Sequence, residues 1–112
     1  MVVQHAKLAD GKWFAMTLAE QLGNIGSEVG RASSWRIRGN KEYFEKAFSR
    51  ALELLDLSLS DNRWRGAKRR EIARAREVVC EALDTESSEH SYDSLNGYFG
   101  HFAILARAQK GF

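Results

Sequence analysis

Apolar and polar positions alternate along most of this chain with the period of an α-helix. A capping box formed by Thr17 and Glu20 precedes apolar residues at spacings of four, three, four and three. These residues are Leu18, Leu22, Ile25, Val29 and Ala32. The stripe predicts a helix from residue 17 to about residue 35, which Gly39 ends.

A second helix is predicted to follow, with Asn40 as its N-cap and residues 60–62 as its end. Its apolar positions are Phe44, Ala47, Phe48, Ala51, Leu54 and Leu55. A third helix is expected over residues 64–84. Its inward positions are Ile72, Ala75, Val79, Ala82 and Leu83.

The segment 84–91 is polar, with three acids and neither lysine nor arginine, and predicts a loop. Ser91 or Asp93 then starts a fourth helix, which Gly111 ends. Its apolar face is formed by Leu95, Phe99, Phe102, Ala103 and Ala106.

These elements predict an all-α fold, an up-down four-helix bundle in a single domain covering residues 1–112. Residues 1–16 form an irregular lead-in, whose Trp13, Phe14 and Met16 are expected to pack back on the bundle. The absence of proline permits long helices.

Composition places the chain among ordinary globular proteins, with 44% hydrophobic and 29% charged residues. No apolar run reaches the roughly 20 residues of a membrane span, and no secretory signal is recognisable. The single Cys80 fits a reducing compartment. We therefore expect a cytoplasmic protein with no membrane partner.

Three glycines, Gly23, Gly26 and Gly30, lie within the first predicted helix and follow Ala19 at helical spacing. Each glycine lowers helix stability by about 1 kcal/mol relative to alanine. We call these four residues the glycine strip, and their cost indicates a structural or functional reason. One interpretation is close approach of another backbone, from helix four or from a second copy of the chain. The other is the floor of a small pocket, with polar groups from Asn24, Ser27, Glu28 and Arg31. Gly97 and Gly100 form a similar thin patch on the fourth helix.

Residues 63–76 contain seven bases and one acid, and indicate a possible nucleic-acid contact. The candidate contact residues are Arg63, Trp64, Arg65, Lys68, Arg69 and Arg70. The bases wrap around the helix rather than forming one stripe, so a solvated and partly ion-paired face is the alternative. Trp35 and Trp64, each among arginines near a helix end, are the aromatics expected at the surface.

No constellation of catalytic, metal-binding or cofactor-binding residues is recognisable, and we assign none. The histidines His5, His90 and His101 lie in different segments, without a Glu-x-x-His pair. Cys80 has no ligand at metal-site spacing, and the helical glycines precede no Gly-Lys-Ser/Thr sequence.

Four blocks of the sequence look familiar together: EQLGNIGSEVGRA (residues 20–32), RALELLDL (50–57), REVVC (76–80) and SLNGYF (94–99). In this order they resemble a family of small prokaryotic helical proteins without an assigned activity. The resemblance implies a helical fold and a bacterial or archaeal cytoplasm.

At the level of fold alone, the chain is also similar to HEPN helical bundles, which often act with nucleotidyltransferases or as RNases. The HEPN nuclease motif is an arginine followed a few residues later by a histidine. Here His101 precedes Arg107, and neither His90 nor His101 follows an arginine at that spacing. The likeness therefore implies a non-catalytic relative.

The sequence thus favours a non-enzymatic interaction module that self-associates as a homo-oligomer or docks on a partner protein. The alternative is a HEPN-like nucleic-acid-binding accessory that uses the basic third helix. Neither hypothesis requires a metal or cofactor.

Overall fold

The computed structural model of the protein describes residues 11–84 and 89–109. In these ranges a short 3-10 helix, η2 (Trp13–Ala15), is followed by four α-helices. They are α1 (Leu18–Arg38), α2 (Lys41–Leu59), α3 (Ala67–Leu83) and α4 (Glu89–Gln109). The predicted all-α four-helix fold is confirmed, and the described residues include no strand.

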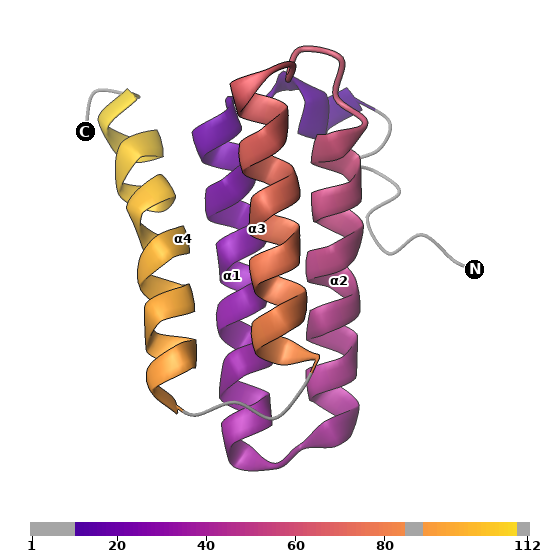
Figure 1. Ribbon diagram of the computed structural model, residues 1–112, viewed down its shortest axis with the longest axis vertical. Helices are drawn as coiled ribbons and strands as arrows, with labels where there is room; N and C mark the ends of the chain where they lie inside the picture. The colour runs from indigo at the N-terminus through magenta and orange to yellow at the C-terminus, as the bar shows by residue number, and fades with distance from the viewer. Residues whose placement is uncertain (1–10, 85–88, 110–112) are drawn as a thin grey trace.

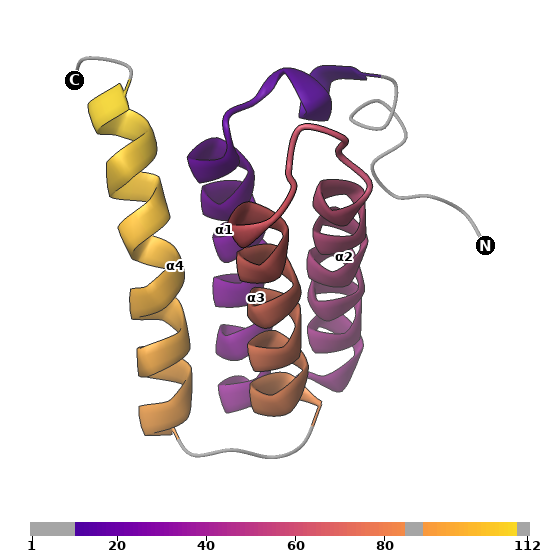
Figure 2. The same ribbon diagram turned by 45° about the horizontal axis from the view of Figure 1, so that its top comes forward.

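The helices lie side by side, with α1 as the central element (Figure 1). It packs mainly against α2 and α4, whereas α3 contacts α2 and, less extensively, α4. α1 and α2 are joined at one end of the molecule and α2 and α3 at the other, so these neighbours run in opposite directions (Figure 2). α4 lies at the side of the bundle and has fewer neighbours than α1.

The predicted boundaries of α1 are confirmed by its caps. Thr17 Oγ1 accepts from the Glu20 backbone N–H at 3.1 Å, and the Glu20 carboxylate accepts from the Thr17 N–H at 3.0 Å. At the other end Gly39 has a φ of +75°, a left-handed conformation that favours glycine. Asn40 then caps α2, because its side chain accepts from the Tyr43 N–H at 3.1 Å.

Two predicted boundaries were wrong. α3 begins at Ala67 rather than at residue 64, because Asp61 holds the preceding turn: its Oδ1 accepts from the Arg63 N–H and its carbonyl from the Trp64 N–H. α4 begins at Glu89, ahead of the predicted Ser91 or Asp93, so residues 89–91 are helical rather than part of the loop. Polar residues, glutamate among them, can be good helix formers, so the polar composition of this segment does not exclude a helix.

The core is formed by most of the predicted apolar positions of the four helices, with Trp13 added from the lead-in and Trp64 from the turn before α3. Trp13 is fully buried, which confirms that the lead-in packs back on the bundle; its residues 1–10 and the predicted stop at Gly111 lie outside the described ranges. The largest fully buried apolar side chains are Trp13, Phe99, Leu22, Ile25, Leu55, Ile72, Leu83, Val29 and Val79. None of the helices in the described ranges is both long enough and apolar enough to cross a bilayer.

Candidate functional site

A network of buried polar groups fills the end of the bundle where α1 begins, and Gln21 is its centre. The Gln21 amide oxygen accepts from Trp64 Nε1 and from Ser58 Oγ, each at 2.8 Å. The amide nitrogen donates to the Trp13 carbonyl at 2.9 Å and to Asp61 Oδ2 at 3.1 Å. Gln21 is fully buried, and the amide uses two donors and two acceptors, so burial leaves none of them unsatisfied.

Arg63 extends this Gln21 network to the surface through Asp61. Its guanidinium donates to Asp61 Oδ2 at 2.7 Å and to Asp61 Oδ1 at 3.0 Å, and it also donates to the Met16 carbonyl at 2.7 Å. These hydrogen bonds from Arg63 hold the pKa of the Asp61 carboxyl below its ordinary value, against the opposing effect of burial. They also raise the pKa of Arg63.

Trp64 was expected at the surface, and that expectation was wrong. Its side chain is only 8% exposed, and its indole N–H is committed to Gln21. The Arg63 guanidinium lies 4.3 Å from the centre of the Trp64 ring and covers it. The partner that buries the indole is 43 residues away in sequence, so the flanking arginines could not reveal it.

The other members of the basic set, Arg65, Lys68, Arg69 and Arg70, lie exposed at the start of α3 and just before it. Arg65 and Arg69 donate to the backbone carbonyls of Asn62 and Leu59. Further along α3, Arg76 pairs with Asp56 of α2 at 3.0 Å. A basic surface is thus present on α3 without the stacking aromatic that the sequence suggested.

The glycine strip of α1 is a helix-packing contact with α4. A Cβ atom on Gly26 would lie 2.5 Å from Phe99 Cβ, and one on Gly23 would lie 3.3 Å from Ala103 Cα. Phe99 therefore occupies the space above Gly26. The close approach of α4 thus fills the space above Gly23 and Gly26, where the alternative interpretation placed the floor of a ligand pocket.

The polar residues expected beside that pocket are engaged elsewhere. Glu28 forms ion pairs with Arg31 at 2.9 Å and with Arg50 of α2 at 3.4 Å. Asn24 is exposed and donates to the Glu20 carbonyl of the preceding turn at 2.8 Å. These contacts direct Glu28 toward α2 and hold the Asn24 side chain against its own helix.

The two glycines of α4 do not contribute to the contact with α1. A Cβ on Gly97 or Gly100 would meet no heavy atom within 4 Å in the described part of the chain. Both lie on an exposed stripe of α4 that continues with Ile104, which is 63% exposed. We call five exposed residues at spacings of four, three, four and three the α4 seam. They are Asp93, Gly97, Gly100, Ile104 and Arg107.

The buried side of α4 is joined to α3 as well as to α1. The Tyr98 hydroxyl donates to the Glu71 carboxylate of α3. Burial, followed by the hydrogen bond and the charge of Glu71, raises the Tyr98 pKa well above its ordinary value. Tyr98 is therefore a neutral hydrogen-bond donor that fixes the rotation of α4, and the α4 seam faces away from the bundle.

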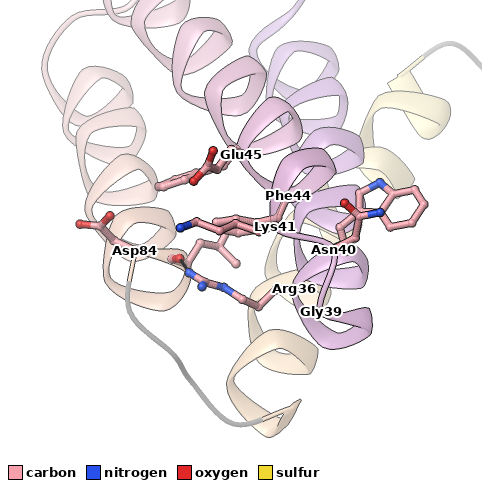
Figure 3. A pocket seen from close by; sticks show the side chains of 10 residues that line it. Arg36, Gly39, Asn40, Lys41, Phe44, Glu45 and Asp84 are labelled. Atoms are coloured by element: carbon pink, nitrogen blue, oxygen red, sulfur yellow. Dashed lines mark hydrogen bonds between the residues drawn. The ribbon is translucent and has the colours of Figure 1, made fainter.

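A pocket of about 450 Å³ opens at the opposite end from the Gln21 network, where α1 ends, α2 begins and α3 ends (Figure 3). It is lined by Trp35, Arg36, Gly39, Asn40, Lys41, Phe44, Glu45, Phe48, Leu83 and Asp84. The charged side chains around it are Arg36, Lys41, Glu45 and Asp84, two of each sign, so the lining favours neither a cationic nor an anionic ligand.

Arg36 crosses this pocket in a structural role. Its guanidinium lies 4.0 Å from the centre of the Phe44 ring and donates to the Leu83 carbonyl. Its Nε is buried and has no hydrogen-bond partner among the described residues. The side chain ties the end of α1 to α2 and to the end of α3, where an unpaired carbonyl is available.

Within the described ranges, no group of three or more metal-ligating side chains comes together. His101 is exposed on α4, while His5 and the side chain of His90 lie outside what the structure describes. Cys80 is a half-buried free thiol whose Sγ contacts Arg76 Nη1 at 3.8 Å.

No family model, no curated protein and no solved structure matches the chain.

Proposed function

We propose that this domain is a non-enzymatic interaction module that self-associates or docks on a partner protein through the exposed face of α4. The observation that carries the proposal is the α4 seam together with Ile104, 63% exposed, and Leu105, 39% exposed. Single exposed apolar residues are common on proteins. Here Ile104 adjoins two side-chain-free positions in open space, which allow another backbone to come close.

The setting we propose for this module is the cytoplasm of a prokaryote. The single cysteine and the resemblance of its sequence blocks to small prokaryotic helical proteins support that setting.

A photo-reactive amino acid at position 104, irradiated in cells that express the chain, tests the proposal. Its matched control carries the same probe in place of Glu77, an exposed residue of α3 outside the α4 seam. We expect a covalent adduct with protein at position 104 and little or none at position 77. Equal labelling at the two positions, or no adduct at either, would contradict a role for this face.

The basic surface supports a second candidate, a HEPN-like nucleic-acid-binding accessory. Arg65, Lys68, Arg69 and Arg70 are exposed and close together in sequence, and clustered cations of this kind bind phosphates. The fold-level likeness to HEPN bundles adds support by analogy only.

Fluorescence anisotropy with labelled RNA and DNA tests this candidate. Binding should weaken with salt, with a log–log slope of roughly one per phosphate contacted on duplex DNA. Reversing the charge of Arg65, Arg69 and Arg70 should abolish it. The matched control reverses the charge of three exposed cations outside α3, namely Arg38, Lys41 and Lys46. It should leave most of the nucleic-acid binding intact. Equal losses in the two variants would indicate a general effect of net charge.

A further inference from the structure

The α4 seam is complementary to itself. Its five residues are all exposed and repeat at the spacing that keeps positions on one side of a helix. From its N-terminal end it presents an acid, two glycines, an isoleucine and a base. These are Asp93, Gly97, Gly100, Ile104 and Arg107.

Nothing in the described part of the chain explains the two glycines. A glycine inside a helix costs about 1 kcal/mol relative to alanine, and Gly97 and Gly100 stand in open space within the described structure. By contrast, Gly26 of α1 is required by the close approach of Phe99. Gly97 and Gly100 would be required in the same way if the backbone of another molecule packed closely against them.

The charged residues at the two ends of the α4 seam, Asp93 and Arg107, indicate which partner packs there and in which direction its helix runs. Asp93 and Arg107 each lie seven residues from Gly100, or about 10 Å along the axis in opposite directions. In an antiparallel pair of α4 helices crossing at Gly100, Asp93 of each copy lies level with Arg107 of the other. Ile104 then lies close to the level of the partner's Gly97. A parallel pair would place like charges opposite each other at both ends.

We infer that a second copy of this chain packs antiparallel on the α4 seam, with a two-fold axis near Gly100, Ile104 over the partner's Gly97, and Asp93 paired with the partner's Arg107. The inference rests on the proposed function and names its partner. Such an interface is isologous, so it closes as a dimer. One helix pair buries less than the standard interface area, so the expected dissociation constant is weak, on the order of 10–100 µM.

A charge-exchange experiment tests the pairing. Asp93→Lys and Arg107→Glu each create two repulsive contacts in a homodimer. Mixed in equal amounts, the two variants form a heterodimer in which both contacts are attractive again. Sedimentation velocity should show each variant alone dimerising at least about tenfold more weakly than the wild type, and the mixture restored. Thermal unfolding of each variant checks that it is folded.

Three outcomes of that experiment overturn the inference. The first is that the wild type forms no dimer at chain concentrations up to about 1 mM. The others are that each variant alone dimerises as tightly as the wild type, or that the mixture dimerises no more tightly than either variant alone.

Cysteine pairing tests the direction in a Cys80→Ser background. An equimolar mixture of Asp93→Cys and Arg107→Cys should form mainly the mixed disulfide, because an antiparallel pair places these two positions level with each other and the mixed dimer keeps one Asp93–Arg107 pair. Each variant cross-linking mainly with itself would indicate a parallel pair and overturn the inference. Glu77→Cys mixed with Arg107→Cys is the matched control and should give no mixed disulfide.

The photo-reactive probe at position 104 separates this inference from the proposed function. An adduct of about twice the chain's 12.7 kDa supports the dimer. An adduct with a different protein and no such dimer overturns the second copy while the docking function stands. No adduct at all contradicts both.

Discussion

The Cα of Gly26 lies so close to Phe99 that a Cβ added to the glycine would be 2.5 Å from the Cβ of Phe99. Real Cβ atoms do not approach this closely, so α1 and α4 reach their observed separation only because residue 26 has no side chain. Phe99 is itself almost completely buried, and its Cβ cannot swing aside as the end of a flexible side chain would.

Gly26→Ala should therefore destabilise the protein although alanine favours helix. Overpacking costs about 1–3 kcal/mol, and the helix propensity of alanine returns at most about 1 kcal/mol. We expect a net loss of about 1–2 kcal/mol in the free energy of unfolding by denaturant. Gly30→Ala is the matched control, because its Cβ would make an ordinary 3.7 Å contact with Asn96 Oδ1. It should be neutral or stabilising, and equal losses in both variants would show that close packing at Gly26 is not the cause.

Alanine at the exposed glycines of α4 should have opposite effects on stability and association. Gly97→Ala and Gly100→Ala add a Cβ in open space, so each should raise the free energy of unfolding of the monomer by about 0.5–1 kcal/mol. The same Cβ atoms would hold two α4 helices apart and weaken the proposed dimer. Denaturant unfolding at low concentration and sedimentation at high concentration measure the two effects separately. A dimer as strong as that of the wild type would exclude close backbone contact at these positions.

Gln21→Leu should be among the most destabilising single changes in the chain. It replaces the amide with a slightly smaller apolar side chain, so four groups lose their hydrogen bond to Gln21. They are the Trp64 indole N–H, the Ser58 hydroxyl, the Trp13 carbonyl and the Asp61 carboxylate. Each unsatisfied buried group costs about 1–3 kcal/mol, so the total expected is roughly 3–5 kcal/mol. Trp64→Phe removes one donor and should cost less, about 1–2 kcal/mol plus any packing loss. Denaturant unfolding followed by circular dichroism compares them, and a larger loss for Trp64→Phe would contradict the central role of Gln21.

Stability at acid pH should depend on Asp61. Its pKa in the folded protein lies below the ordinary value of 3.8, so the carboxylate contributes stability above pH 3.8 that is lost as pH falls through the lower, folded-state pKa. Asp61→Asn should lower the free energy of unfolding at pH 7 and flatten its dependence on pH below about 4. Glu77→Gln, at an exposed position of α3, is the control. An acid profile of Asp61→Asn that matches the wild type would show that Asp61 does not drive this dependence.

Local signals in the sequence were sufficient to predict most helix ends. The capping box of Thr17 and Glu20, the left-handed Gly39 and the N-cap Asn40 each act within a few residues, so their partners are visible in the sequence itself. The glycines of α1 also indicated close helix packing, because their cost demands a reason wherever the partner lies.

Features that depend on distant partners could not be predicted in the same way. Trp64 lies among arginines, which indicates a surface residue, but its indole N–H donates to Gln21 of α1 and its side chain is buried. The glycine strip, Asn24 and Glu28 all lie on α1. Only the positions of α2 and α4 show that the glycines face α4, that Glu28 pairs with Arg50 of α2, and that Asn24 is exposed. The α4 seam carried a recognisable signal, the helical spacing from Asp93 to Arg107. Its exposure became apparent only once the buried side of α4 was known.

The Gln21 network gives this protein a built-in optical reporter. Of its three tryptophans, Trp13 and Trp64 hydrogen-bond within that network, while Trp35 lines the pocket at the opposite end of α1. In a Trp35→Phe variant the tryptophan fluorescence, excited selectively over tyrosine, would arise only from the network end. In a variant that keeps Trp35 alone it would arise only from the pocket end. Loosening of one end of the bundle before the other would then appear as two emission shifts at different denaturant concentrations.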